Sequence, residues 1–314
     1  MISVDGYEII KKLGTGAFGT VYKANHLKSN NIVAIKVENK ERHSRLIYEC
    51  EIYKALDNAL GFPKLYDFQE TSDKNICILD YLGPSLEDLF EFSNGIFSIK
   101  TVLMVGIQVL NRIEELHNIG YLHRDIKPDN FLIGLDTNKD IIYLIDLGLS
   151  KIFNKKSYKK TCSFKGTLRY SSLRNHKGIE QSYRDDLESL AYMLIYFSKN
   201  SLPWQNIKIK DKLKKKEKIY TIKKTNSVQT LCSGLPIEFE YYLKYVQVLM
   251  FKEKPDYKYL INLFKNILKK RNLELDNEYD WSIKINSLQH TSKTSDKTVV
   301  HDISDDTRNS TRSI

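Results

Sequence analysis

The chain has 314 residues, of which 41% are hydrophobic, and it carries a formal net charge of +10. This content can bury a substantial core, and the longest apolar stretches, near 102–110 and 190–197, fall well short of the roughly 18 residues that a membrane-spanning helix needs. Asp5 and Glu8 interrupt the N-terminus before an apolar signal segment develops, and the four cysteines are too widely spaced for a disulfide or zinc framework. We therefore expect an intracellular protein, cytoplasmic or nuclear, with no membrane partner.

Three short strands are predicted within residues 7–37, and a glycine-rich loop joins the first two. The loop reads GTGAFGTV at 14–21, where Gly14, Gly16 and Gly19 leave room for backbone N–H groups to approach a phosphate. A dinucleotide-binding loop would need a helix after its third glycine, and the following VYKAN is a poor helix start. The pattern therefore predicts a hairpin that covers bound phosphates.

The third strand contains VAIK at 33–36, a pattern that places Lys36 where its ammonium can reach the α- and β-phosphates of ATP. The next segment, 44–56, has the apolar spacing of a helix and is expected to supply the acid that pairs with this lysine. Glu49 and Glu51 both lie there, about 200° apart around the helix, so only one of them can face the lysine. The spacing alone does not choose between them.

A strand is predicted to end near Asp80, followed by a connecting segment over 79–82. Backbone groups of this connection are expected to bind adenine, with Leu79 at the back of the pocket. The next predicted element is a long amphipathic helix over 98–117, with Ser98 suited to cap its start. This helix leads the chain directly into a polar loop.

The polar loop, HRDIKPDN at 123–130, is typical of the catalytic loop of a protein kinase. In that pattern Asp125 accepts the proton of the substrate hydroxyl, while Asn130 and Asp146 hold the Mg²⁺ ions that bridge the phosphates of ATP. Asp146 also comes at the exit of a strand predicted over 141–145, as a metal-binding aspartate of this kind should.

The ordered motifs together predict an α+β protein, a bilobal protein-kinase fold over about 5–285. We expect a small β-rich N-lobe over about 5–80, a hinge over about 80–83 and a larger, mainly α-helical C-lobe over about 84–285. His123 is a second candidate base within the loop, but a buried structural histidine is the better interpretation.

Four longer stretches resemble the casein kinase I family of Ser/Thr protein kinases, namely LGPSLEDLF at 82–90, HRDIKPDNFL at 123–132, GIEQSYRDDLESLAYMLIYF at 178–197 and SLPWQ at 201–205. The similarity extends over about residues 5–285. It implies an enzyme that uses ATP and Mg²⁺ to phosphorylate Ser or Thr in acidic or pre-phosphorylated protein substrates. We expect this enzyme to be a monomer.

The resemblance also assigns roles to individual residues. Glu49 takes the place of the acid that pairs with Lys36, and Asp186 takes that of an aspartate that braces the catalytic loop from below. The residues implied in catalysis are Asp125, Lys127, Asn130 and Lys36, with Lys127 contacting the transferring γ-phosphate. The residues implied around ATP are Leu13, Gly14, Gly16, Gly19, Val21, Ala34, Lys36, Glu49, Leu79, Asp80, Leu82 and Leu132.

Some residues depart from the pattern of that family. Leu147 stands where most members have Phe, and it keeps an apolar plug beside the metal-binding aspartate. The segment 148–166 is shorter than in the family pattern, and Asn206 replaces a Gly near the expected anion site. Residues 171–174, Ser-Ser-Leu-Arg, occupy the position of the Ala-Pro-Glu element of most kinases, which the family also lacks. These departures bear on regulation and substrate choice more than on the chemistry.

Positive charge is densest over 208–224, which holds nine lysines against Asp211 and Glu217. We interpret most of these lysines as a solvated surface. The resemblance places Arg169 and Lys215 in a pocket for phosphate or acidic groups. An Arg side chain can pair with a phosphate through two N–H groups, and the surrounding positive potential would attract acidic peptides.

Two other classes of function fit the sequence less well. A catalytically silent, kinase-like scaffold usually loses the equivalents of Lys36, Asp125 or Asp146, and this chain keeps all three. A nucleic-acid-binding role for 208–224 lacks support because no aromatic residue except Tyr220 is interleaved with the lysines.

Residues 286–314 are polar and show no sustained periodicity, so we predict a disordered tail rich in Ser and Thr. Ser304, Thr307, Ser310 and Ser313 recur at intervals of three, the spacing that a kinase phosphorylating its own tail stepwise would use. Because Ser and Thr are frequent in this segment, chance accounts for the spacing equally well.

Overall fold

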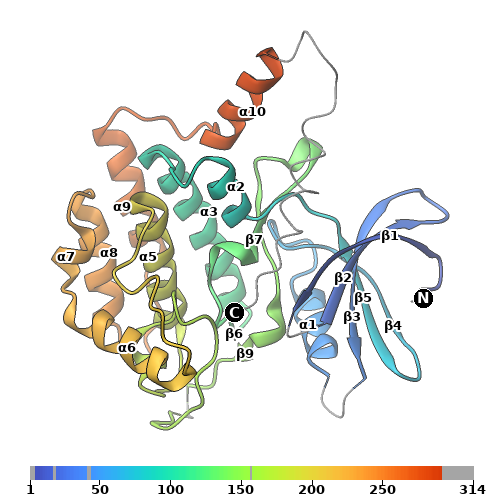
Figure 1. Cartoon of the computed structure of the whole chain (residues 1–314), viewed down its shortest axis with the longest axis horizontal. Coiled ribbons are helices and arrows are strands. Elements are labelled where there is room, and N and C mark those ends of the chain that lie inside the picture. The colour runs from blue at the N-terminus through green and yellow to red at the C-terminus, as the bar shows by residue number, and fades with distance from the viewer. Residues whose placement is uncertain (1–3, 17–18, 41–43, 156–157, 292–314) are drawn as a thin grey trace. The chain divides into compact units, whose positions relative to one another are not determined.

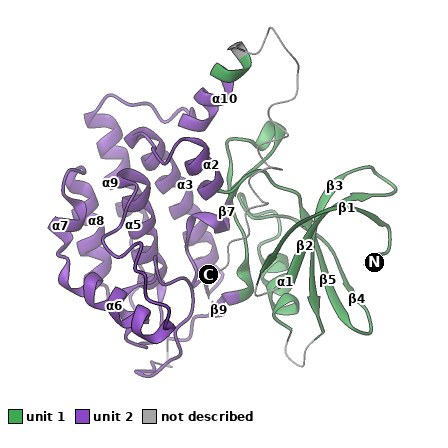
Figure 2. Ribbon diagram, viewed as in Figure 1, with its two compact units in different colours: residues 1–85, 132–148, 287–314 green, residues 86–131, 149–286 purple. Residues whose placement is uncertain are grey.

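The structure is a computed structural model, and it describes residues 4–16, 19–40, 44–155 and 158–291 (Figure 1). The chain forms two compact units, which Figure 2 distinguishes by colour. Unit 1 comprises residues 1–85, 132–148 and 287–314. Unit 2 comprises residues 86–131 and 149–286. Within the described residues no helix is both long and apolar enough to cross a membrane.

Unit 1 is built on a five-stranded antiparallel sheet with the strand order β1-β2-β3-β5-β4. The strands and the helix that follows β3 are β1 (Tyr7–Gly16), β2 (Gly19–His26), β3 (Ile32–Asn39), α1 (Arg45–Ala55), β4 (Leu65–Glu70) and β5 (Lys74–Asp80). The glycine-rich loop thus joins β1 and β2 as a hairpin, as predicted, and residues 17–18 at its tip lie outside the described residues.

The two faces of β3 explain how Lys36 is presented. Val33, Ile35 and Val37 alternate along the strand and pack into a buried apolar cluster. Because successive side chains of a strand point to opposite faces, Ala34 and Lys36 project from the other face of the sheet. The β-branched residues that favour the strand therefore also fix the direction of the lysine.

Residues 132–148 belong to unit 1, although the sequence placed them in the larger lobe. They contain most of the short strand pair β7 (Phe131–Ile133) and β8 (Ile142–Leu144) and the 3₁₀ turn Asp136–Asn138. Backbone hydrogen bonds explain the difference, because the N–H of Gly83 donates to the carbonyl of Ile133 and the N–H of Leu144 donates to that of Gly61. These bonds link segments far apart in the sequence and leave no local sequence signal.

Unit 2 is mainly helical, which together with the sheet of unit 1 confirms the predicted α+β class. Its helices are α2 (Leu86–Phe92), α3 (Ile99–Asn118), α4 (Leu173–His176), α5 (Tyr183–Lys199), α6 (Lys212–Thr225), α7 (Val228–Cys232), α8 (Ile237–Val248), α9 (Tyr257–Lys270) and the first part of α10 (Asp280–Thr291), whose residues from 287 onward belong to unit 1. A short strand pair, β6 (Tyr121–Leu122) with β9 (Lys151–Ile152), and the 3₁₀ turn Pro128–Asn130 complete it.

Helix α3 is the central element of unit 2 and packs against α5 and α9 (Figure 1). Ser98 caps its start by accepting a hydrogen bond from the N–H of Thr101, so the predicted helix and its cap are confirmed. Gly106 lies on the packed face, where an added Cβ would come within 2.8 Å of the Phe264 ring. The close packing of α3 holds its C-terminal end, from which the catalytic loop continues.

The prediction of a disordered tail from residue 286 is wrong for its first part, because α10 continues to Thr291. Trp281 anchors the helix by burial at 1% exposure, and Ile285 and Leu288 follow it at helical spacing, a short repeat among polar residues that is easily missed. The Ser/Thr ladder over 292–313 lies outside the described residues.

Candidate active site

Lys36 lies at the centre of a charged cluster in unit 1. Its Nζ is 2.7 Å from Oε2 of Glu49 and 2.9 Å from Oδ1 of Asp146. Ser44 caps α1 and sets the helix so that Glu49 is on the buried face, with 2% of its side chain exposed. Glu51, the alternative acid, is exposed to solvent. The structure thus selects Glu49 as the partner, a choice that the spacing alone could not make.

Electrostatics keep this lysine charged. Burial by itself would lower the pKa of Lys36, but the charges of Asp146 and Glu49 raise it above its ordinary value. Burial in turn raises the pKa of Glu49, although the neighbouring ammonium acts in the opposite direction. The result is a cation fixed in place by two carboxylates, suited to holding phosphate oxygens.

Asp146 follows β8 directly and has a left-handed backbone, with φ of 61°. Its N–H donates to the hydroxyl of Tyr53 on α1, at 3.2 Å, which ties this turn to the helix that carries Glu49. The next residue, Leu147, is fully buried and acts as the apolar plug expected from the sequence. The turn therefore directs the carboxylate of Asp146 toward Lys36 while Leu147 is anchored in the core.

The glycines of the hairpin differ in what they are needed for. An added Cβ at Gly14 or Gly16 would meet no atom within 4 Å, so neither glycine is required by the packing of the described residues. At Gly19 the φ is 118°, and a Cβ would come within 2.3 Å of the carbonyl oxygen of Val37. Gly19 is thus needed for the fold, whereas Gly14 and Gly16 leave open space along the hairpin.

The other residues expected around ATP also lie in unit 1, on or beside the sheet. Leu13, Leu79 and Leu82 are buried, and Val21, Ala34 and Leu132 are half-buried. Asp80 has structural partners, because its carboxylate accepts hydrogen bonds from the N–H of Lys64 and the hydroxyl of Tyr66, each at 2.8 Å. The carboxylate of Asp80 therefore braces the end of β5.

The catalytic loop of unit 2 holds Asp125 in a defined orientation. One carboxylate oxygen accepts a 2.8 Å hydrogen bond from the hydroxyl of Thr167, and the other lies 3.4 Å from Nζ of Lys127. Nδ2 of Asn130 donates to the carbonyl of Asp125 at 2.9 Å. These contacts bring together the three loop residues singled out by the sequence and add Thr167, which the sequence did not indicate.

Asp186 on α5 supports this loop from beneath. Its carboxylate accepts hydrogen bonds from the backbone N–H groups of His123 and Arg124, both at 2.8 Å, and from Nε2 of His117 at 2.9 Å. Burial would raise the pKa of Asp186, but the hydrogen bond and charge of His117 hold it below its ordinary value. His123 is fully buried and its Nδ1 accepts from the N–H of Asp125, which suits a structural histidine.

The activation segment, residues 149–178, meets the catalytic loop at two points within unit 2. Near its start, the Arg124 guanidinium donates to the carbonyl of Leu149 at 2.7 Å. Further along, Gly166 passes so close to the catalytic loop that a Cβ there would lie 2.4 Å from the carbonyl oxygen of Arg124. A glycine is therefore required where the segment crosses the loop.

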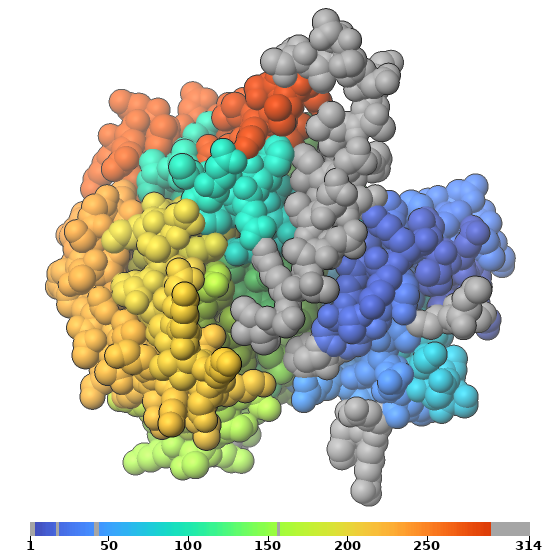
Figure 3. Space-filling model, viewed as in Figure 1, coloured from blue at the N-terminus to red at the C-terminus, as the bar shows by residue number. Residues whose placement is uncertain are grey.

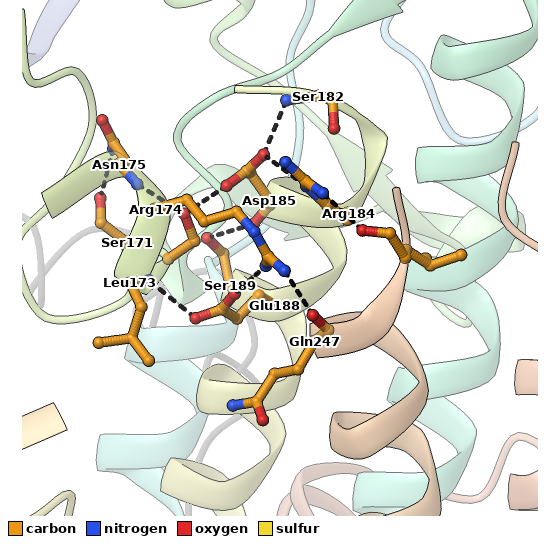
Figure 4. Close-up of polar contacts among 12 residues, drawn as sticks. Ser171, Leu173, Arg174, Asn175, Ser182, Arg184, Asp185, Glu188, Ser189 and Gln247 are labelled. Atoms are coloured by element: carbon orange, nitrogen blue, oxygen red, sulfur yellow. Dashed lines mark hydrogen bonds and ion pairs between the residues drawn. The ribbon is translucent and has the colours of Figure 1, made fainter. Parts of the chain in front are cut away.

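The region that replaces the Ala-Pro-Glu element is anchored by a pair of opposite charges (Figure 4). Arg174 lies 3.5 Å from Oε2 of Glu188 on α5 and donates to the carbonyl of Gln247 near the end of α8. The other oxygen of Glu188 accepts from the N–H of Leu173 and the hydroxyl of Tyr192, each at 2.8 Å. Sequence reasoning missed this pair, although an acid within an apolar helix was a usable signal.

Asp185 lies on α5 three residues before Glu188 and is also buried. Figure 4 shows its polar contacts. Asp185 accepts from the hydroxyl of Ser172 at 2.5 Å and from the N–H of Ser182 at 2.7 Å. Burial raises the pKa of Asp185 to about 6 despite these hydrogen bonds. The two serines, which cap α4 and α5, are thereby joined through one carboxylate.

Arg169 and Lys215, the expected anion-binding residues, come from the activation segment and from α6, which lies on the surface of unit 2 (Figure 3). The Arg169 guanidinium lies over the rings of Tyr170 and Tyr196 and 3.9 Å from Oε1 of Glu87, with 36% of its side chain exposed. Lys215 is half-buried in the first turn of α6. Arg169 is thus partly engaged by protein groups and partly open to solvent.

The pH dependence of the free energy of unfolding tests how His176 is buried between the activation segment and α6. Burial, with the charge of Lys223, lowers the pKa of His176 to about 3, so the folded protein keeps it neutral while the unfolded chain protonates it below about pH 6.5. The contribution of His176 to the free energy of unfolding is therefore fully present above pH 6.5. It is lost as the pH falls toward 3, at up to about 1.4 kcal/mol per pH unit. Between pH 7 and pH 5, the free energy of unfolding measured by urea titration should fall by about 2 kcal/mol more for the wild type than for His176→Gln. Equal losses would show that His176 is not kept neutral by the fold.

A family model described as a protein kinase domain matches residues 7–274. The match spans most of the chain and includes the glycine-rich hairpin, the Lys36 cluster and the catalytic loop. It agrees with the architecture, an N-terminal antiparallel sheet of five strands followed by a helical C-terminal region, and so confirms the predicted kinase fold. The chain therefore belongs to the protein kinase family.

Proposed function

We propose that this kinase transfers the γ-phosphoryl group of ATP to Ser or Thr in acidic or phosphate-primed proteins, in the manner of casein kinase I. Membership of the protein kinase family supports phosphoryl transfer itself. The Ser or Thr acceptor and the acidic or primed class of substrate are what we propose in addition. The observation that carries the proposal is the intact charged set, in which Lys36 is held by two carboxylates and Asp125 is oriented by the Thr167 hydroxyl of the activation segment.

The residues present fit a nucleotide bound with Mg²⁺. Mg²⁺ prefers oxygen ligands, and Asn130 and Asp146 supply an amide and a carboxylate oxygen. Nδ2 of Asn130 is used by the carbonyl of Asp125, which leaves its Oδ1 as the atom suited to a metal. When bound, ATP with Mg²⁺ supplies the transferable phosphoryl group and neutralises the charge that develops on it.

The chain's own residues would then position and deprotonate the acceptor. Asp125 accepts the proton of the substrate hydroxyl, and the Thr167 hydroxyl fixes the rotation of its carboxylate. Lys127 lies next to this carboxylate and offers a positive charge to the phosphoryl oxygens. Lys36 holds the α- and β-phosphates, because its pairing with Glu49 prevents it from moving away.

Substrate preference is assigned to the basic groups around the activation segment. Arg169 presents a partly exposed guanidinium, and an incoming phosphate would compete with Glu87 for it. Lys215 lies in the first turn of α6, and its neighbours Lys212, Lys214 and Lys216 add positive potential that attracts acidic peptides. By the resemblance to casein kinase I, we assign the negative charge of the favoured acceptor to the N-terminal side of the target Ser or Thr.

A peptide-array kinase assay tests this proposal directly. Matched Ser, Thr and Tyr peptides would be offered in acidic, phospho-primed and basic sequence contexts, with ATP and Mg²⁺. We expect phosphate incorporation into Ser and Thr, highest in the primed and acidic sets. Preference for basic peptides, transfer to Tyr alone, or no transfer to any peptide would each refute the proposal.

Neutralising the anion pocket should change substrate choice more than turnover. Replacing Arg169 and Lys215 together by Ala should lower kcat/KM on primed peptides by about 10-fold or more, because each lost charge-assisted hydrogen bond is worth about 1.5–3 kcal/mol when well formed. Unprimed peptides should be affected far less. Steady-state kinetics on one primed and one unprimed peptide of the same sequence measure the difference.

The matched control removes two positive charges from other positions of α6, the helix that carries Lys215. Lys218 and Lys224 are exposed on α6, and replacing both by Ala lowers the net charge equally. This control should leave the ratio of primed to unprimed activity unchanged. If the Arg169 and Lys215 variant loses activity equally on both peptides, the two residues act structurally instead.

A further inference from the structure

Lys223 on α6 differs from the other lysines of its region. It is 2% exposed, and its ammonium donates to the carbonyl oxygens of Leu168 at 3.0 Å and Ser171 at 2.6 Å. The same ammonium lies over the rings of Tyr192 and Trp204, 4.8 and 4.9 Å from their centres. A lysine in a solvated basic surface would make none of these contacts.

The stability of the fold does not explain this lysine well. No ion pair involves Lys223 among the residues that the structure describes, and burial lowers its pKa well below the ordinary value. A buried charge without a counter-ion is costly unless its N–H groups are hydrogen-bonded. The directed N–H groups are what a lysine provides here that an apolar side chain cannot.

Those N–H groups hold a segment that lies beside the catalytic aspartate. Lys223 binds the carbonyls of residues 168 and 171, and the indole N–H of Trp204 donates to the carbonyl of Arg169 between them, at 2.7 Å. The N–H groups of Tyr170 and Ser171 both donate back to the carbonyl of Thr167. The backbone from 167 to 171 is therefore fixed by hydrogen bonds along its whole length.

Two functional side chains depend on the position of this backbone. Thr167, at its start, donates to the carboxylate of Asp125, and Arg169, in its middle, carries the guanidinium assigned to substrate anions. We propose that Lys223 is a positioning residue that sets the backbone of residues 167–171 and thereby aligns Thr167 and Arg169 with the substrate. The inference rests on the proposed function and gives this one residue of α6 a part in aligning the substrate.

The test compares Lys223→Met with Lys224→Met. Met keeps the length of the side chain and removes the ammonium, and Lys224 is the exposed neighbour on the same helix. In the full chain, Lys223→Met should raise the KM for a primed peptide about 10-fold or more, with a smaller rise for the unprimed peptide and an unchanged KM for ATP. Lys224→Met should match the wild type in all three values.

Trp204→Phe is a second variant, which keeps an aromatic ring near the ammonium and removes the N–H donor to Arg169 together with the five-membered ring of the buried indole. It should shift the peptide KM in the same direction by a smaller factor. A fall in kcat and a rise in both KM values in proportion to a lowered Tm would overturn the inference, because that pattern indicates a general loss of folding. A peptide KM equal to that of Lys224→Met would also overturn it.

Hydrogen exchange separates this inference from the proposed function. The amides of Tyr170 and Ser171 should exchange at least about 10-fold faster in Lys223→Met than in Lys224→Met, while those of α3 stay protected. A wild type that transfers phosphate to no peptide would refute the proposed function, and the exchange comparison would still decide the role of Lys223. Equal exchange in both variants would show that Lys223 does not position the segment.

Discussion

Asp125→Asn should lower kcat by about 10² or more while leaving the fold and the KM for ATP nearly unchanged. Asn has the same shape as Asp, and its carbonyl oxygen can still accept the hydrogen bond from the Thr167 hydroxyl. What it lacks is the ability to accept the proton of the substrate hydroxyl and the charge beside Lys127. Phosphate incorporation at saturating ATP and peptide gives kcat, and thermal unfolding reports on the fold.

Asp129→Asn is the matched control for this experiment. Asp129 lies in the same catalytic loop, on the 3₁₀ turn Pro128–Asn130, is exposed, and undergoes the same change of charge. Its replacement should leave kcat within about 2-fold of the wild type, as expected of a surface substitution away from the reacting groups. Near wild-type turnover in Asp125→Asn would rule out the assigned role of Asp125 as the proton acceptor.

Lys36→Met should reduce kcat by about 10² to 10³, the range found when one preorganised charge-stabilising group is removed from an active site. It should also lower the free energy of unfolding by about 3–5 kcal/mol at neutral pH, because a buried carboxylate loses its cation. Glu49 is that carboxylate, with 2% of its side chain exposed, whereas Asp146 is 25% exposed and can be solvated.

The double variant Lys36→Met with Glu49→Gln separates the two effects. It replaces the buried charge by a neutral amide, so most of the lost stability should return while activity stays low. Urea unfolding and phosphate incorporation measure the two quantities on the same preparation. Recovered activity in the double variant would mean that Lys36 acts only by compensating Glu49, and that phosphate binding is not its role.

Local sequence patterns were sufficient for the parts of the fold that are held by nearby residues. The alternation of Val33, Ile35 and Val37 predicts both the strand and the face from which Lys36 projects. The Ser98 cap and the apolar stripe behind it predict α3 to within a residue at each end. In these elements the same residues favour the strand or helix locally and form its buried apolar face. The local pattern therefore predicts both the element and the face that packs into the core.

Contacts between distant segments could not be predicted in this way. Glu49 and Glu51 are equivalent by spacing, so the residue pattern alone left the choice open; the resemblance pointed to Glu49, and the packing of α1 against the sheet buries it. Lys223 is one of nine lysines in its region, and its burial follows from the rings of Tyr192 and Trp204, which come from other parts of the chain. Its spacing of four from the buried Ile219 was the one local hint.

Glu180 holds two distant points of the activation segment through one carboxylate. One oxygen accepts from the Lys151 ammonium at 2.6 Å, the other accepts from the N–H of Lys159 at 2.8 Å, and the side chain is 8% exposed. In many kinases a phosphate added to this segment supplies the anion that orders it. Here a carboxylate of the chain itself supplies an anion to this segment, and a phosphatase cannot remove it.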